Sequence, residues 1–281
     1  MKLLLCIGLL ISFQAQAGVL NNLVKESKIS TQPKIFIFDL DETLIDSTPR
    51  RYVATRQAIE FACNIFSPPM RSGFIEEPRC EDYRRVSLYD LYKLKNRYQI
   101  SYALKALETA PVYEMDLLPL ITEKSLKIYL SGNHLELDTA YLGAVSFIQD
   151  LKKVGAEIFF VSSRSLEKQN KGTRESLKKL GLIDDVADDH VILKSDSQSS
   201  IDFKTKTFKK IKTIAVRKNA KILGVFENEP ENMNAMLRLF PEAQAVFVSG
   251  AFIKDVPIEG KPHFINDYLE YNESNLQEIS Q

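Results

Sequence analysis

The segment KIFIFDLDETLIDS, from Lys34 to Ser47, constrains the fold more than any other part of the chain. Five of its first seven residues are apolar, as in a strand that is buried on both faces. Asp39 and Asp41 nevertheless stand at the end of this strand, and Asp46 follows. An ionised group that is buried without a partner costs several kcal/mol. A metal site or a reaction centre at the strand end would offset that cost.

Asp39 and Asp41 are two positions apart, so their side chains point broadly the same way if the strand geometry continues. Two carboxylates about 4 Å apart repel each other by roughly 4 kcal/mol at an effective dielectric constant of about 20. A divalent cation or a shared proton would relieve this repulsion and give the pair different roles, one as an ionised nucleophile and one as a proton carrier. The simpler interpretation is a strand that ends in acidic residues without a function.

Four further apolar runs are typical of buried strands, and helical patterns separate them. We expect these strands to start at Glu157, Val191, Ile222 and Ala245, and the helices to span 141–154, 173–180, 204–219 and 231–239. The alternation predicts an α/β fold in which helices cover both faces of a parallel sheet. Ligands of such sheets bind beyond the carboxyl ends of the strands, where the polar residues of this chain fall.

The segment 47–137 interrupts this alternation, because it has little strand signal and much helical character. Apolar residues recur at helical spacing in TPRRYVATRQAIEFACNIF and in SLYDLYKLKNRYQISYALKALE, and prolines and a glycine separate the two runs. We therefore predict a helical insertion over 47–137, directly after the first strand, and an α/β core formed by 18–46 and 138–281.

The length of the chain limits the number of domains, and its charge balance bears on the partners that it could bind. The 281 residues suffice for one large or two modest domains with a sizeable core. The 37 basic and 37 acidic residues balance, so no overall field attracts nucleic acid or an anionic membrane. Nothing in the sequence indicates a nucleic-acid partner.

The first 17 residues have the pattern of a secretory signal peptide. Lys2 supplies a positive charge, Leu3 to Phe13 form an apolar stretch, and Ala15 to Ala17 provide a small-residue cleavage site. The apolar stretch is too short to span a bilayer comfortably. We expect cleavage near Ala17, no stable membrane anchor, and a secreted or periplasmic protein; the alternative is an uncleaved N-terminal anchor.

Removal of this segment leaves two cysteines, Cys63 and Cys80, which is an even number for an oxidising compartment. A bridge that closes this loop is worth about 3 kcal/mol in the chain-entropy model. We predict a structural disulfide between the two, with a pair of buried free thiols as the alternative.

Four motifs, in this order, resemble the signatures of the haloacid dehalogenase (HAD) superfamily of phosphohydrolases. The first signature, D-x-D-x-T-L after a hydrophobic strand, is similar to FDLDETL, and the second, a strand that ends in Thr or Ser, is similar to IFFVSSR. The third is a lysine, found here as Lys204 in IDFKTKTF, and the fourth is the acidic cluster of ILGVFENEPENMN. The resemblance extends from Lys34 to Asn234 and implies a Rossmann-like core with the helical insertion as a cap.

The resemblance implies a role for each matching residue. Asp39 would attack the phosphorus atom and form an aspartyl-phosphate. Asp41 would protonate the leaving oxygen and then take a proton from the hydrolytic water. Lys204 would neutralise charge on the nucleophile and on the phosphoryl group, and Lys206 is the alternative lysine. An acid at position 41 also favours phosphate esters, because members that release halide lack it.

Other matching residues would bind phosphate and metal. Thr43 and either Ser162 or Ser163 would hold the phosphoryl oxygens. The resemblance also implies a Mg²⁺ ion with hard oxygen ligands, namely Asp39, the Asp41 carbonyl, Glu227 and, through waters, Asn228 or Glu231. The fourth signature has glutamates where most members carry aspartates, which would alter the metal position or affinity. The alternative is that ENEPEN is only the solvated start of a helix.

We therefore predict a Mg²⁺-dependent phosphatase that hydrolyses small phosphate monoesters. A non-catalytic phosphate-binding protein and a phosphotransferase on the same fold are the alternatives. Several residues of the insertion are candidates to contact an anionic or aromatic substrate, or else form an exposed helix face: Arg50, Arg51, Arg84, Arg85, Tyr89 and Tyr92. We expect the histidines to be structural or surface residues: His134, His190 and His263.

Overall fold

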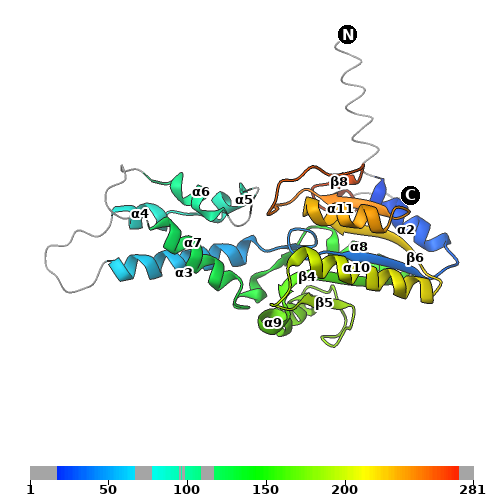
Figure 1. The fold of residues 1–281 in the computed structure, drawn as a ribbon. Helices are drawn as coiled ribbons and strands as arrows, with labels where there is room; N and C mark the ends of the chain where they lie inside the picture. The colour runs from blue at the N-terminus through cyan, green and yellow to red at the C-terminus, as the bar shows by residue number, and fades with distance from the viewer. Residues whose placement is uncertain (1–17, 67–77, 95, 97–98, 109–116, 272–281) are drawn as a thin grey trace, which may run out of the picture.

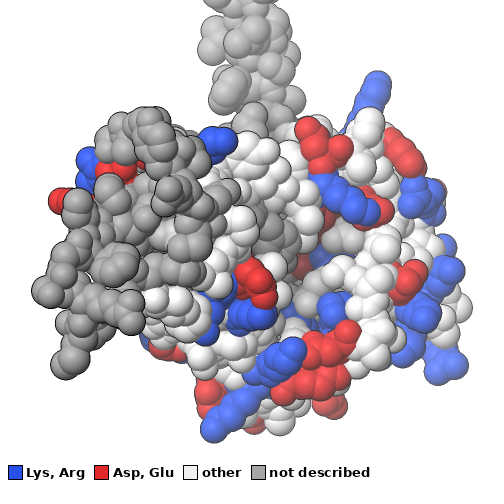
Figure 2. Space-filling model, turned by 60° about the vertical axis from the view of Figure 1, so that its left-hand side comes forward, with Lys and Arg blue, Asp and Glu red and all other residues white. Residues whose placement is uncertain are grey.

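The computed structural model describes residues 18–66, 78–94, 96, 99–108 and 117–271 of the chain. The predicted signal peptide, residues 1–17, lies outside the described residues. Within the described part, no helix is both long enough and apolar enough to cross a membrane. Positive and negative side chains are interspersed on the face that Figure 2 shows, in keeping with the balanced charge of the sequence.

Six strands form one parallel sheet in the order β5-β4-β1-β6-β7-β8 (Figure 1). Their bounds are Lys34–Phe38 for β1, Ala156–Ser165 for β4, Val191–Lys194 for β5, Lys221–Glu227 for β6, Gln244–Val248 for β7 and His263–Ile265 for β8. The predicted parallel sheet is therefore confirmed. Strand β1 lies between β4 and β6, so the first, second and fourth signatures end at neighbouring positions along one edge of the sheet.

Helices cover both faces of this sheet. On one face α2 (Val19–Ile29) and α8 (Ala144–Lys153) pack in one apolar cluster with Phe36 and Phe38 of β1. On the other face α10 (Ser200–Arg217) and α11 (Pro230–Leu239) pack with Ile35 and Ile37. Successive β1 side chains thus enter opposite cores, which explains why this strand is a continuous apolar run.

The helical segment after β1 forms a lobe of its own, on the left of Figure 1. Its helices are α3 (Thr48–Phe66), α4 (Pro78–Arg84), α5 (Leu88–Tyr92), α6 (Ile100–Lys105) and α7 (Leu118–Tyr129). A separate apolar cluster, which includes Ile59, Leu104 and Ile121, holds these helices together. The chain enters the lobe through β2 (Ile45–Asp46) and returns through η1 (Leu135–Leu137) and β3 (Thr139–Ala140), which pairs antiparallel with β2.

The structure differs from the predicted helix bounds at α9, which spans Leu166–Lys179 and thus begins seven residues before the predicted position. The side chain of Ser165 accepts a hydrogen bond from the backbone N–H of Lys168 and so caps the helix at this earlier point. The first turns are almost entirely polar, which hides their helical periodicity in the sequence.

Cys63 of α3 and Cys80 at α4 are joined by a disulfide, as predicted. Their Cα atoms are 5.8 Å apart and both residues are buried in the apolar cluster of the lobe. The bridge spans 17 positions of sequence, including the segment 67–77. It therefore ties two helices of the lobe together where the chain between them is long.

We expect a Cys63→Ser, Cys80→Ser double variant to lower the free energy of unfolding by about 3 kcal/mol, because the unfolded chain regains the loop entropy that the bridge removes. Urea unfolding of the mature protein measures this loss. A reductant should destabilise the wild-type protein by a similar amount and leave the double variant unchanged. Equal stability of wild type and variant, both without reductant, would contradict a structural bridge.

Candidate active site

A pocket of about 450 Å³ lies at the carboxyl ends of β1, β4 and β6. Most of the predicted site residues line it, together with Leu130 from the helical lobe: Asp39, Asp41, Ser162, Ser163, Lys204 and Glu231. The parallel sheet brings these residues together because strand ends that are far apart in sequence share one edge.

Lys204 lies between two carboxylates at the base of this pocket. Its Nζ donates hydrogen bonds to Asp39 Oδ1 at 2.7 Å and to Glu227 Oε2 at 2.6 Å. All three residues are buried, and Asp39 and Glu227 follow or end the adjacent strands β1 and β6. With Glu227 ionised, the three formal charges sum to −1.

Burial alone would lower the pKa of Lys204, but Asp39 and Glu227 raise it above its usual value and keep the ammonium charged. Burial and the charge of Asp39 raise the pKa of Glu227 to about 7, although Lys204 opposes that shift. The lysine is positioned by α10, which begins after Ser199, whose side chain accepts a hydrogen bond from the backbone N–H of Asp202.

Thr43 connects the first and fourth signatures. Its hydroxyl lies 3.1 Å from Asn228 Oδ1 and 3.4 Å from Asp39 Oδ2, and because it has one proton it donates to one of them at a time. Asn228 is buried and also donates from Nδ2 to the carbonyl of Ala251. Asp39 Oδ2 and Asn228 Oδ1 are therefore oxygen acceptors that face the same hydroxyl.

The carboxylates of the fourth signature have partners within the protein. Glu227 Oε1 accepts hydrogen bonds from the backbone N–H groups of Asn228 and Glu229, each at 3.1 Å. Glu229 accepts one from the backbone N–H of Ile253, and Glu231 pairs with Lys254 on the pocket wall. Across the described ranges, no group of three or more His, Cys, Asp and Glu side chains is arranged to hold a metal ion.

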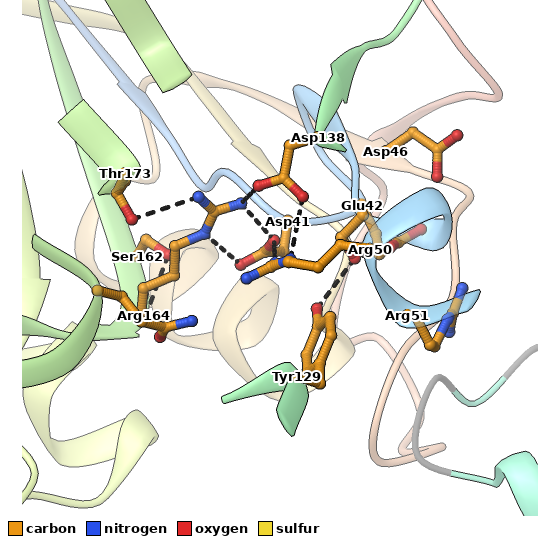
Figure 3. A network of polar contacts seen from close by, with 12 residues as sticks. Asp41, Glu42, Asp46, Arg50, Arg51, Tyr129, Asp138, Ser162, Arg164 and Thr173 are labelled. Carbon is orange, nitrogen blue, oxygen red and sulfur yellow. Dashed lines mark hydrogen bonds and ion pairs between the residues drawn. The ribbon is translucent and has the colours of Figure 1, made fainter. Parts of the chain in front are cut away.

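Two arginines hold Asp41 (Figure 3). Arg164 of β4 donates from Nε to Oδ2 at 2.9 Å and from Nη2 to Oδ1 at 2.7 Å, a two-point contact. Arg50, near the start of α3, donates from Nη2 to the same Oδ1 at 3.1 Å. The Asp41 side chain is 13% exposed, and it is the member of this group that lines the pocket.

Asp138 lies directly before β3 and pairs with both arginines (Figure 3). Its Oδ2 accepts from Arg164 Nη2 at 2.7 Å, and its Oδ1 is 3.0 Å from Arg50 Nε. Burial raises the pKa of Asp138, although the charges of Arg164 and Arg50 oppose that shift. With both aspartates ionised, the formal charges of Asp41, Asp138, Arg50 and Arg164 sum to zero. These four residues are called the Asp41 network below.

The sequence pattern points to only part of this network. Arg50 is expected either on an exposed face or against a substrate, yet it is buried behind Asp41. Arg164 belongs to the segment that resembles the second signature. The sequence gives one indication of its role, which is that a charged residue follows directly after a buried strand run. Nothing near Asp138 distinguishes it in the sequence.

The two serines of the second signature differ in environment. Ser162 is 1% exposed and its Oγ accepts a hydrogen bond from the backbone N–H of Arg164 at 3.3 Å. Ser163 is half-buried, and both serines line the pocket. Both serines therefore belong to the same site, and either one is placed to bind phosphate.

The other candidates from the helical lobe do not line this pocket. Arg51 is buried and lines a separate cavity of about 250 Å³, and Tyr92 donates a hydrogen bond to Asp46. The other three lie elsewhere on the lobe: Arg84 pairs with Glu60, Arg85 pairs with Asp82, and Tyr89 stacks under Lys93.

Each histidine also contacts residues outside the pocket: His134 contacts Gln57, His190 contacts Glu157 and Asp188, and His263 contacts Gln244.

Lys204→Met leaves Asp39 and Glu227 buried without their shared cation, so we expect it to lower the free energy of unfolding by about 3–5 kcal/mol near neutral pH. The raised pKa of Glu227 favours its protonated form in the folded state, so the folded protein loses stability as pH rises from 4.5 to about 7. The deficit of the variant should therefore shrink near pH 5. Urea unfolding in the presence of EDTA measures it.

Lys206→Met is the matched control, because Lys206 lies two residues away and is exposed. We expect its stability to stay within about 0.5 kcal/mol of the wild type. If the two variants lose the same stability, or if the deficit of Lys204→Met grows at low pH, Lys204 does not neutralise the buried carboxylates.

Residues 104–224 match the model of a protein family that is described as HAD superfamily, subfamily IIIB (acid phosphatase). The matched segment contains Ser162, Ser163 and Lys204, whereas Asp39 and Glu227 lie outside it. None of the curated proteins matches the chain.

Three solved structures illustrate the structural similarity. A predicted phosphoglycolate phosphatase from Haemophilus somnus 129pt is 16% identical, with 89% of this chain and 99% of that chain covered and a TM-score of 0.49. A HAD family hydrolase from Deinococcus radiodurans R1 is 16% identical, with 88% and 97% covered and a TM-score of 0.46. A class C acid phosphatase from Bacillus anthracis is 13% identical, with 89% and 78% covered and a TM-score of 0.41.

Proposed function

We propose that this phosphatase of the HAD superfamily, to which residues 104–224 are assigned, hydrolyses small phosphate monoesters through an aspartyl-phosphate on Asp39. One observation carries the proposal. Asp39 lines the pocket with Oδ1 paired to Lys204, while Oδ2 has only a long contact with the Thr43 hydroxyl among the described residues. A carboxylate that is paired with a buried lysine and has its second oxygen only weakly engaged in a pocket is suited to nucleophilic attack.

In the first step, a carboxylate oxygen of Asp39 bonds to phosphorus and the bond from phosphorus to the ester oxygen breaks. Asp41, which is protonated when the ester binds, gives that proton to the departing oxygen, so the alcohol leaves neutral. Water then attacks the phosphorus atom, Asp41 takes its proton, and phosphate leaves with Asp39 restored. Lys204 balances charge on Asp39 and on the phosphoryl group throughout.

The phosphoryl oxygens need donors in this pocket, and the second signature supplies them. Ser162 and Ser163 both line the pocket, and the Thr43 hydroxyl lies next to Asp39. We assign phosphate binding to these three hydroxyls together with Lys204. Lys206 is exposed and has no part in this assignment.

Phosphatases of this superfamily generally use a divalent metal ion, and we propose Mg²⁺ here. The oxygens of Asp39 and Asn228 fit such an ion best, since they are hard ligands at a group with net negative charge. The Asp41 carbonyl is a third ligand by resemblance. Glu227 would have to exchange its bond with Lys204, and Glu231 its pair with Lys254, before either could bind metal. The ion would neutralise charge that develops on the phosphoryl oxygens.

We also propose that the chain acts outside the cytoplasm, after cleavage near Ala17, and that the helical segment 47–137 is a cap that limits access to the pocket. The signal-like pattern of residues 1–17 and the cysteine bridge support the first statement. Leu130, which follows α7 and lines the pocket beside the core residues, supports the second. Loss of residues 1–17 in the intact mass of exported protein tests the first.

Asp39→Asn should lower kcat for p-nitrophenyl phosphate by at least about 10³-fold, because the amide cannot form the aspartyl-phosphate. Release of p-nitrophenol by purified mature protein with Mg²⁺ measures this, and removal of the metal with EDTA should abolish most of the activity. Asp189→Asn is the matched control, since Asp189 is exposed and does not line the pocket, and its rate should equal that of the wild type.

Folded wild-type protein that releases no phosphate from any monoester, with Mg²⁺ present, would contradict the proposal. That result would favour a phosphate-binding protein in which the bonds of Glu227 to Lys204 and to the backbone leave no metal ligand at this position. Transfer of the phosphoryl group to an added alcohol would instead indicate a phosphotransferase.

A further inference from the structure

The partners of Asp41 lie behind it, away from the pocket. Asp41 lines the pocket wall, while Arg50, Arg164 and Asp138 are not among the described residues that do. The exposed fractions of their side chains are 1%, 2% and 0%. A substrate in the pocket therefore meets the Asp41 carboxylate and none of these three. Any effect that they have on the reaction acts through Asp41.

The contacts fix the Asp41 carboxylate in both rotation and position. The two-point contact from Arg164 sets the plane of the carboxylate, because the guanidinium fork is rigid. Arg50 contacts Oδ1 from a different element, the first helix of the lobe. The remaining nitrogen of Arg164, Nη1, donates to Thr173 of α9, which anchors that arginine to the core.

Asp138 keeps the two guanidiniums together. Arg50 and Arg164 both contact Asp41 Oδ1, so their positive groups lie close to one another and repel. Asp138 contacts each of them with a different oxygen and balances the second positive charge. The ring of Tyr129 lies 4.3 Å from Arg50 Cζ and supports that guanidinium on its face.

The two connections of the helical lobe each supply one residue to this network. Arg50 stands in the first turn of α3, where the chain enters the lobe, and Asp138 stands just before β3, where the chain returns. Arg164 belongs to the core sheet. The arrangement of the lobe on the core is thus linked by direct ionic contacts to the orientation of one carboxylate in the pocket.

We propose that Asp138 and Arg50 are positioning residues that, with Arg164, align Asp41 for proton transfer to the leaving oxygen, and that hydrolysis of alkyl phosphates depends on them. The inference rests on the proposed function. An alkoxide is a poor leaving group and needs the proton as its bond to phosphorus breaks, whereas p-nitrophenolate leaves without it. A misaligned Asp41 therefore slows alkyl esters more than aryl esters.

The test compares kcat/KM for glycerol 2-phosphate and for p-nitrophenyl phosphate, since kcat/KM includes the departure of the leaving group. In Asp138→Asn and in Arg50→Gln, we expect the value for the alkyl ester to fall at least about ten-fold more than the value for the aryl ester. Two variants are used so that a folding defect in one leaves the other informative. In an Asp41→Asn background, Asp138→Asn should add little further loss.

Asp46→Asn is the matched control. Asp46 is a buried carboxylate near the same loop. It accepts hydrogen bonds from the Thr48 backbone and from Tyr92, and it does not line the pocket. A structural disturbance of this kind should change both esters by the same factor. The ratio of the two kcat/KM values then separates alignment of Asp41 from general damage to the fold.

Equal losses for both esters in Asp138→Asn and Arg50→Gln would overturn the inference, since the residues would then only stabilise the fold. Faster hydrolysis of the alkyl ester in either variant would overturn it too, because the network would then restrain Asp41. A wild-type protein that hydrolyses neither ester would overturn the proposed function and with it any proton transfer from Asp41. The three results are distinct.

Discussion

The pairing of one buried lysine with two buried carboxylates is the interaction on which the site depends. Asp39 and Glu227 are brought together by the adjacent strands β1 and β6, and neither charge is tolerable there without a partner. Lys204 reaches both from α10, which packs on the sheet face opposite to α2 and α8. The order of the strands thus places the two carboxylates side by side, and the position of α10 supplies the ammonium group that balances their charge.

A second ionic group with a different balance stands beside the first. The group around Lys204 has a net charge of −1 when Glu227 is ionised, which suits a site that binds a cation. The Asp41 network pairs two arginines with two aspartates. The two carboxylates of the first signature thus differ in their contacts. Asp39 has one oxygen with only a long contact, while both oxygens of Asp41 accept hydrogen bonds from arginine.

The sequence predicts the strands and their parallel arrangement well, because each strand is a short apolar run that ends in polar residues. It predicts Asp39, Asp41 and Lys204 as neighbours through ordered motifs, and the structure brings them to one pocket. Helix α9 is harder to predict from the sequence, since its first turns are polar and contain Gly172. A Cβ at Gly172 would lie 2.8 Å from Leu135 Cδ1. That glycine reflects close packing between elements, which periodicity within one segment does not reveal.

The partners of Asp41 could not be predicted from the sequence for a related reason. Asp138 and Arg50 are separated by nearly the whole helical lobe, and β2 and β3 bring them together only when the chain returns to the core. Charged residues at such positions are usually solvated, so the sequence favours an exposed role for Arg50. Only the three-dimensional pairing of four charges shows that these residues are buried.

The most direct test of the account is to identify the residue that becomes phosphorylated during turnover. Wild-type protein would be mixed with excess phosphate monoester and Mg²⁺, quenched in acid, digested and examined by mass spectrometry. The account predicts one phosphoryl group on Asp39, removed by hydroxylamine, and none in Asp39→Asn protein. A phosphoryl group on another residue, or turnover by Asp39→Asn protein at the wild-type rate, would contradict it.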